Sequence, residues 1–464
     1  MALPLAYAKM FPVHRFTSVG TDKLYPFAIL GGEALSVQWV FIYIERIDTF
    51  EDFQYLRTAW DALYHADPEA QFFLSWKWLT GPLESYPEEW MVLVARSAEG
   101  TALGLLPLRL KTLWSKSRQK LRNELHFAGR LFWADYGGIL CHPDHEELVL
   151  GTCAAYLKQM HWSHIFLKGF RTSARRFELF MKPFMDERLL VESLTSVIND
   201  GETDNLLCPY IDLPDTFAAY LAQLSSNTRQ KISRFLRKLE SSSEYRITTT
   251  DVTTHSRDVQ ILTMLWSNMW GEQKGADTQR LAAKYGKIIQ RGLEDELAHL
   301  LVLWHREKPI GVLASFVDWE YSRLLFFVSG RDENFRDLPV GLVLRAWNIR
   351  WTIEHGLRTY DFLRGNEPYK YSLGAADVRV QYPAIRTKSG TNLNDKLDPG
   401  CITEALSLAD DFVRRGRQQR AITACQQILA TIPEHQAAMR LLRSLEFLPQ
   451  SPAAKQPRLP FARE

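Results

Sequence analysis

The sequence predicts an α/β protein made of two similar units, followed by a small pair of helices. Residues 300–370 carry the clearest pattern, in which three apolar strands precede a charged loop, a helix and one further strand. Residues 91–169 repeat much of this order, and both runs close on the motif Phe-Leu-basic-Gly. A polar stretch then leads to a last helical region that is poor in aromatic residues. The order strand, loop, helix and parallel strand is typical of proteins that hold phosphate groups.

Each element is predicted from the local spacing of apolar residues and from the polar turns that interrupt it. Alternating or continuous apolar runs of four to nine residues bounded by polar turns predict strands, and apolar residues at helical spacing predict helices. In the first run these are strands at 39–44, 91–96, 102–110 and 164–167 and helices at 50–64 and 144–160. Between the runs, helices are expected at 215–224, 228–239, 256–273 and 277–297. In the second run they are strands at 300–304, 310–318, 323–328 and 359–363 and a helix at 338–355.

Composition shifts divide the chain. The lysine- and arginine-rich segment 114–122 is expected to be a solvated loop. The domains are an N-terminal arm (1–36), a first unit (37–200), a second unit (206–390), a linker (391–401), a helical segment (402–445) and a disordered tail (446–464).

The overall composition is that of an ordinary globular protein. Of 464 residues, 46% are hydrophobic, and the net charge of +2 argues against a dedicated DNA-binding protein. The five cysteines include no C-x-x-C pair, which favours a reducing compartment, and we expect a cytoplasmic protein. No apolar stretch reaches the roughly 20 residues that a membrane-spanning helix needs, so no membrane span is expected.

Several short motifs carry a family resemblance. The run from Asp361 to Lys370 reads Asp-Phe-Leu-Arg-Gly-Asn-Glu-Pro-Tyr-Lys, and glycines 311, 341 and 356 punctuate the elements before it. The first half holds Phe-Leu-Ser-x-x-Trp at 73–78 and Asp-Tyr at 135–136. On these residues, the chain from 37 to 390 resembles the FemAB-like and CelD-like branch of the GNAT acyltransferases. The resemblance implies an α/β (α+β) fold of two tandem GNAT-like units, with mixed sheets flanked by helices.

The resemblance also implies a chemistry. An acyl group, the acetyl group of acetyl-CoA as co-substrate, would pass to an amine of a polysaccharide- or cell-envelope-related acceptor. The donor would lie between the parallel strands 323–328 and 359–363, at the start of the following helix. The implied cofactor-binding residues are Phe327, Val328, Arg331, Arg336 and Gly341.

The phosphate loop departs from the usual GNAT pattern. Residues 331–341 hold three acids, which oppose an anion, and Pro339 lacks an N–H donor. Two alternatives therefore stay open. One is a FemAB-like transferase that uses aminoacyl-tRNA, and the other is a catalytically weakened GNAT-derived binding or scaffold protein.

The implied catalytic residues follow the last strand. Glu367 would accept a proton or position the amine, Lys370 would contact an anion or oxyanion, and Tyr369 would protonate the leaving group. Alternatively, Glu367 and Lys370 form only a surface ion pair around a turn. Asp361 as the base and Tyr371 as the acid are further options.

The implied substrate-binding residues come from both halves of the chain. They are Asp135, Tyr136, Arg229, Arg234 and Arg364. The structural alternatives are a turn at 135–136 and a solvated basic face on the helix at 228–239. No metal is expected, because neither pair of histidines, 142/145 or 161/164, has a cysteine or acid that completes a usual ligand set.

The C-terminal segment 402–445 looks like one tetratricopeptide repeat, with two helices and a proline after the second. A single repeat cannot bury its own faces. We therefore expect it to dock on the core, to bind a protein partner or to self-associate.

Overall fold

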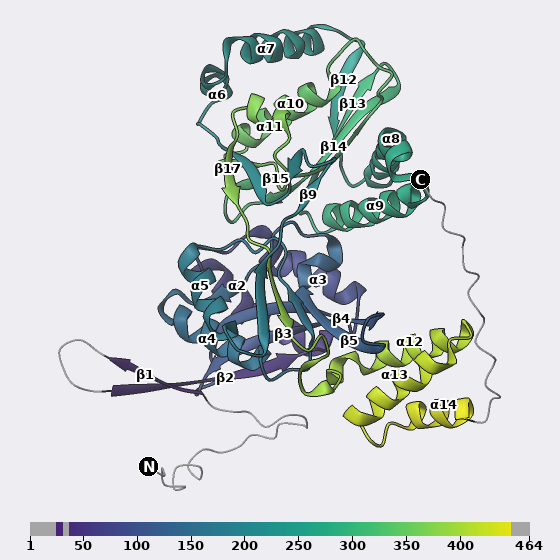
Figure 1. The fold of residues 1–464 in the computed structure, drawn as a ribbon. Coiled ribbons are helices and arrows are strands. Elements are labelled where there is room, and N and C mark those ends of the chain that lie inside the picture. Colours follow the sequence, from purple (N-terminus) through teal and green to yellow (C-terminus); the bar gives the residue numbers. More distant parts are fainter. Residues whose placement is uncertain (1–24, 31–36, 447–464) are drawn as a thin grey trace, which may run out of the picture.

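The computed structural model describes residues 25–30 and 37–446 and contains two large mixed sheets flanked by helices (Figure 1). This is the α/β (α+β) class that the sequence predicts. Most of the expected N-terminal arm and the tail from residue 447 lie outside the described residues. Within those residues, no helix is long and apolar enough to span a membrane.

The first sheet has the strand order β1-β2-β3-β4-β5-β7-β18-β8, with β6 beside β4. Its strands are β1 (Tyr25–Leu30), β2 (Val37–Ile47), β3 (Trp90–Ser97), β4 (Ala102–Ser115), β5 (Lys120–Phe127), β6 (Leu140–Cys141), β7 (His164–Phe166), β8 (Leu189–Ser193) and β18 (Pro383–Thr387). The helices of this unit are α1 (Phe50–Tyr55), α2 (Arg57–Ala66), α3 (Trp76–Ser85), α4 (Glu146–Leu157) and α5 (Ala174–Met181).

The second sheet has the order β12-β13-β14-β15-β16-β11-β17. Its strands are β11 (Leu207–Asp212), β12 (Tyr245–Thr249), β13 (Ala298–His305), β14 (Lys308–Asp318), β15 (Arg323–Arg331), β16 (Thr359–Asp361) and β17 (Ala376–Arg379). Its helices are α6 (Phe217–Gln223), α7 (Ser226–Ser241), α8 (His255–Lys274), α9 (Thr278–Glu294), α10 (Val340–Glu354) and α11 (Pro368–Ser372). A small ribbon of β9 (Val197–Ile198) and β10 (Thr203–Asp204) precedes this unit.

The two sheets share one internal plan, as the repeated motif order predicts. In each, antiparallel strands are followed by a helix and by a strand parallel to the last of them: β5 with β7 in the first unit and β15 with β16 in the second. Helices α4 and α10 occupy the same place in this order. The closing motifs Phe-Leu-Lys-Gly and Phe-Leu-Arg-Gly therefore leave equivalent strands.

The last strand crosses between the units. We assigned residues 206–390 to the second unit, but β18 pairs with β7 and β8 of the first sheet. The chain thus returns to its first sheet after the second is complete, so sheet membership does not follow that boundary. Figure 1 shows this return as a light-green strand among the purple and blue ones.

A shared apolar core joins the units. Along β13, Leu300 and Val302 face the core that also contains the helices α8 and α9, whereas Leu301 and Leu303 face α7 and α10. Both faces are therefore covered, which explains the continuous apolar run in this strand. Phe316 of β14 stacks on Phe72 of the first unit with ring centroids 5.3 Å apart.

The C-terminal helices dock on the first unit. Instead of a two-helix hairpin, the described chain forms three helices, α12 (Ile402–Arg414), α13 (Gln418–Thr431) and α14 (Gln436–Glu446). Trp114 packs edge-on against Phe412, and the Gln427 amide both accepts from the Leu121 N–H and donates to its carbonyl oxygen. The C-terminal helices, yellow in Figure 1, thus lie against the start of β5. Docking on the core is one of the three roles that we expected.

One further local expectation was wrong. Residues 114–122 form the tip of the β4–β5 hairpin rather than a loose loop, because Trp114 and Leu121 are held by the C-terminal helices. Helix α3, which continues through Gly81 and Pro82, was not foreseen. The short helices α5 and α11 and the strand β17 were not foreseen either.

Candidate active site

A cavity of about 580 Å³ opens at the start of α10, and its wall also includes residues of α7 and α11 and the last residue of β15. Strands β15 and β16 pair in parallel only from Arg323 to Leu325 on β15, and no ladder bond joins them beyond that point. A bulge at Phe327 also shifts the register of β15 on β14. The ladder between the two parallel strands therefore ends at Leu325 and Asp361, and none of its residues lines the cavity.

The cavity wall combines apolar and basic side chains. Its cations are Lys231, Arg331, Arg336 and Arg345, and its acids are Asp332 and Glu333. Four cations and two acids leave an excess of two positive charges. The Asp332 carboxylate accepts a hydrogen bond from Lys308 Nζ at 2.6 Å, and Glu333 accepts one from Arg331 at 2.9 Å. Both acids are thus paired, so they oppose an anion less than the sequence suggests.

The start of α10 offers one donor to this cavity. Pro339 is the residue before the helix, and the N–H groups of Leu342 and Val343 donate to its carbonyl oxygen. Among the hydrogen bonds of the described residues, none has the Gly341 N–H as donor. The buried Nε of Arg345 also has no hydrogen-bond partner among the described residues. These orphaned donors and the basic excess fit a phosphate-bearing cofactor such as acetyl-CoA.

Tyr369 lies in the cavity wall, as a leaving-group acid would require. The Arg345 guanidinium is 4.1 Å from the centre of its ring. Burial raises the pKa of Tyr369, although Arg345 acts in the opposite direction, so the hydroxyl keeps its proton at neutral pH. Tyr371 is different, because its half-exposed hydroxyl donates to Asp377 at 2.9 Å and does not line the cavity.

Lys370 and Glu367 form an ion pair next to Tyr369 in the sequence. Lys370 is 2% exposed, and its Nζ donates to the carbonyl oxygens of Phe362, Arg364 and Gly365 at 3.3, 3.0 and 2.7 Å. Burial lowers the pKa of Lys370, while Glu367, whose Oε2 is 3.0 Å from Nζ, opposes this shift. Neither residue lines the cavity. Lys370 is therefore a buried anchor of the turn, not half of an exposed ion pair.

Asp135 and Tyr136 reach across to the second unit. Asp135 Oδ1 accepts from Arg364 Nε at 2.6 Å and lies 2.5 Å from its Nη2. The Tyr136 hydroxyl donates to the Asp361 carboxylate at 2.9 and 3.1 Å. Three of the residues predicted to bind substrate thus meet at the junction of the units.

The buried carboxylate of Asp361 accepts hydrogen bonds from several groups. Besides Tyr136, it accepts from Arg171 Nη1 at 3.2 Å and from the Leu363 N–H at 2.8 Å, and it is 1% exposed. A carboxylate that accepts from three donors in the core has a structural role, rather than the role of base that was a further option.

The family comparison decides what kind of unit holds the cavity. Residues 226–371 match the family model described as an acetyltransferase (GNAT) domain. The matched residues lie within the second unit and make up about a third of the chain. That match includes Glu367, Lys370, both parallel strands and the cavity wall apart from Ser372 and Leu373. Among the curated proteins, none matches the chain.

Three solved structures resemble this chain to different degrees. The structure of FemX aligns over 74% of this chain and 97% of its own, with a TM-score of 0.50 and 11% identity. A conserved protein of unknown function from Bacteroides thetaiotaomicron aligns over 74% and 99%, with a TM-score of 0.44 and 13% identity. The tandem GNAT protein from the clavulanic acid biosynthesis pathway aligns over 74% and 98%, with a TM-score of 0.39 and 13% identity. At 11% identity, the likeness to FemX shows the fold alone.

Only some of the residues that we predicted to bind the cofactor line the cavity. Arg331, Arg336 and Gly341 line it, but Phe327 packs against Tyr285 and Phe316 on the side of the shared core. Val328 is buried in that same core. The bulge in β15 accounts for this, because it turns these side chains away from α10.

The basic helix α7 contributes differently from our expectation. Arg234 is exposed and lies over the ring of Phe235 at 4.5 Å, and neither it nor Arg229 lines the cavity. Lys231 and Phe235 line it instead. Lys231 and Phe235 are four residues apart and share one face of the helix, whereas Arg229, two residues before Lys231, lies on another face.

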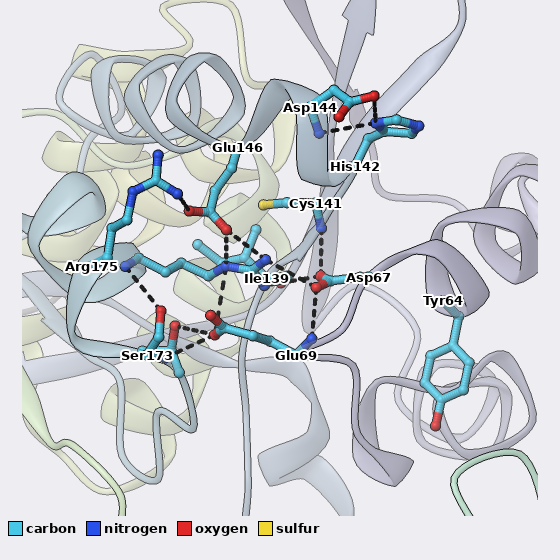
Figure 2. Close-up of polar contacts among 12 residues, drawn as sticks. Tyr64, Asp67, Glu69, Ile139, Cys141, His142, Asp144, Glu146, Ser173 and Arg175 are labelled. Atoms are coloured by element: carbon cyan, nitrogen blue, oxygen red, sulfur yellow. Dashed lines mark hydrogen bonds and ion pairs between the residues drawn. The ribbon is translucent and has the colours of Figure 1, made fainter.

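A buried ion cluster in the first unit is structural (Figure 2). Arg176 is 2% exposed and donates to Asp67 at 2.9 and 3.0 Å and to Glu146 at 2.9 Å, while Glu69 accepts from Ser173. These contacts tie α5 to the start of α4 and to the loop after α2. Within the described residues, no group of three or more histidine, cysteine or acidic side chains could hold a metal ion.

Several site residues escaped the sequence reasoning. Arg345 lies one helical turn after Gly341, so helical spacing could have placed it in the cavity. Lys168 stands in the first repeat where Arg364 stands in the second, and the repeat could have indicated it. Arg130 and Arg171 had no signal in the sequence, since only the fold brings them to the junction.

Proposed function

We propose that this protein is an acyltransferase that moves an acyl group from acetyl-CoA to an amine of a polysaccharide- or cell-envelope-related acceptor. The observation that supports this donor is the cavity at the start of α10, whose wall has an excess of two positive charges and lies mostly within the residues that match the GNAT model. The acceptor class rests on the sequence resemblance of residues 37–390.

The cavity residues would hold the donor through its phosphates. Arg336 is exposed at the rim, no ion pair is found for it among the described residues, and Lys231 faces it from α7. The unpartnered Gly341 N–H points from the first turn of α10, where the helix dipole favours an anion. When bound, acetyl-CoA supplies its acyl group as a thioester.

The residues after β16 would manage the protons. Attack of the amine nitrogen on the thioester carbonyl forms an N–C bond, breaks the C–S bond and releases one proton from the amine. Glu367 would accept that proton, and Tyr369 would give its own to the departing sulfur. Lys370 would hold the turn that carries both side chains.

Calorimetry with acetyl-CoA tests the donor. We expect binding in the micromolar to millimolar range and a loss of about tenfold or more in Arg336→Glu, because a charge-assisted contact becomes a repulsion. Arg440→Glu, at an exposed arginine of α14, is the matched control and should bind like the unchanged protein. Absence of binding at millimolar acetyl-CoA would contradict a CoA-dependent enzyme.

One observation favours a second candidate, the aminoacyl-tRNA-dependent transfer. The exposed side of α7 carries Arg234, Arg237 and Lys238, and its one acid, Glu240, is paired with Arg350 at 2.7 Å. Such a face suits a polyanion larger than CoA.

Binding of tRNA at several salt concentrations separates the two donors. The double variant Arg234→Glu, Arg237→Glu should weaken tRNA binding and flatten its salt dependence if this face holds tRNA. Acetyl-CoA binding should not change in this variant. Equal tRNA affinity of both proteins would remove the tRNA-dependent candidate.

A further inference from the structure

The two Phe-Leu-basic-Gly motifs of the repeat converge on one residue. Gly169 (φ +78°) and Gly365 (φ +99°) both take the left-handed conformation that lets the chain turn after the parallel strands β7 and β16. A Cβ on Gly169 would lie 2.2 Å from the carbonyl oxygen of Asp135, so its turn packs directly on the Asp135 backbone. Arg364, just before Gly365, bonds the Asp135 side chain from the other unit.

Three basic residues at or near these turns lie around a single acidic residue, Asp135. Arg130, whose Nη1 donates to the Ala134 carbonyl oxygen at 2.7 Å, joins Lys168 and Arg364 around Asp135. Among the described residues, no ion pair is found for Arg130 or Lys168. Lys168 Nζ lies only over the ring of Tyr382, at 5.4 Å from its centre. Three cations and one carboxylate leave an excess of two positive charges.

This arrangement is unfavourable without a further anion. Burial, Arg364 and Arg130 lower the pKa of Lys168 to about 8, and burial and Arg364 lower the pKa of Arg130 to about 10. Asp135 offsets these shifts only in part. Half-buried cations that repel one another are held in place at a cost in stability, which a bound dianion removes.

We propose that Arg130, Lys168 and Arg364 form an anion site at the junction of the two units, and that it takes a phosphate group of the amine acceptor. The acceptor role rests on the proposed function, whereas the anion site itself rests only on this cluster. A phosphate dianion matches the excess of two charges, and guanidinium groups hold its oxygens in fork geometry. The site is distinct from the donor cavity, because none of the three residues lines that cavity.

Titration calorimetry of the full chain with inorganic phosphate and pyrophosphate tests this site. Lys168→Gln and Arg130→Gln should each weaken binding about tenfold, the usual effect of losing one charge-assisted hydrogen bond. Lys168 Nζ makes no hydrogen bond within the described residues, so its replacement leaves the fold intact. Asp135→Asn should strengthen binding, since it removes the one opposing charge. Lys182→Gln, at an exposed lysine, is the control and should change nothing.

Saturating acetyl-CoA separates this site from the donor cavity. Phosphate binding that persists with acetyl-CoA present and responds to Lys168→Gln supports the proposal. Binding that acetyl-CoA abolishes, or that neither cluster variant weakens, overturns it, as does the absence of any phosphate binding. If phosphate binds at the cluster but acetyl-CoA does not bind at all, the CoA-dependent function fails while the anion site stands.

Discussion

One carboxylate oxygen of Asp135, Oδ1, forms an ion pair between the two units of the chain with Nε and Nη2 of Arg364. The nitrogen–oxygen distances are 2.6 and 2.5 Å, and both side chains are less than a fifth exposed. Below them, Tyr136 and Asp361 make a second, fully buried contact. The contacts of Asp135 with Arg364 and of Tyr136 with Asp361 therefore join the two units. The end of β16 is held in place by the first unit as well as by its own sheet.

Replacing Tyr136 by phenylalanine should weaken this junction. The change removes one donor to the buried Asp361 carboxylate but leaves Arg171 and the Leu363 N–H in place. We expect the free energy of unfolding to fall by about 1.5–3 kcal/mol, the range for a hydrogen bond to a charged group. Urea denaturation measures this. Tyr371→Phe is the matched control, because its hydroxyl bonds the exposed Asp377, and it should cost less than about 0.5 kcal/mol.

Lys370→Met should destabilise the protein more strongly. The methionine keeps much of the side-chain volume, but it leaves the carbonyl oxygens of Phe362, Arg364 and Gly365 without their shared donor. A loss of about 3 kcal/mol or more follows, because unpaired buried acceptors cost about 1–3 kcal/mol each. Lys238→Met removes a 3.4 Å contact of an exposed lysine with a carbonyl oxygen and should have little effect. Equal stability of the two variants in urea would show that Lys370 is not an anchor.

Lys168 should make stability depend on pH. Its ammonium lies over the Tyr382 ring, and burial, Arg364 and Arg130 lower its pKa to about 8 in the folded protein, while Asp135 opposes this shift only in part. The unfolded chain keeps this proton up to about pH 10.4, so it binds more protons than the folded state between these values. Stability contributed at this position therefore rises with pH across that window and is lowest below pH 8.

The variant Lys168→Gln lacks this titration. In phosphate-free buffer, urea denaturation should show it to be more stable than the unchanged protein at pH 7, with the difference shrinking by pH 9.5. A difference that grows over this range would have the wrong sign for a cation with a lowered pKa.

The predicted elements of the fold came from patterns that the structure satisfies locally. The apolar runs at 300–304 and 310–318 lie in central strands covered on both faces, and the helix expected at 338–355 is α10. The expectation for residues 114–122 failed because it treated charge as a sign of solvent. The basic residues there flank a hairpin that is held by Gln427, about 300 residues away, and such distant pairing leaves no local signal.

The site was predictable to the extent that it follows the chain. Glu367, Tyr369 and Lys370 follow one strand, so one motif indicated all three, but only the fold shows that Tyr369 alone lines the cavity. Arg130 and Lys168 belong to the other unit, and the contacts that bring them near Arg364 are tertiary. Charge excess at a junction is a sum over distant residues, which a local motif cannot express.

Glu367→Gln gives the sharpest test of the proposed chemistry. The glutamine keeps the shape of the side chain over Gly365, where a Cβ would lie 2.8 Å from Glu367 Oε2, but it cannot accept the amine proton. We expect turnover with acetyl-CoA and an amine to fall by about 10²–10⁴-fold, the range for loss of a general base, while acetyl-CoA affinity by calorimetry stays the same. A purely structural role predicts a different result, in which the loss of stability accounts for the lost turnover and Glu367→Asp fails to restore it. Turnover that is unchanged in Glu367→Gln would exclude Glu367 from the proton transfer and leave Tyr369 as the one proposed catalytic group in the cavity wall.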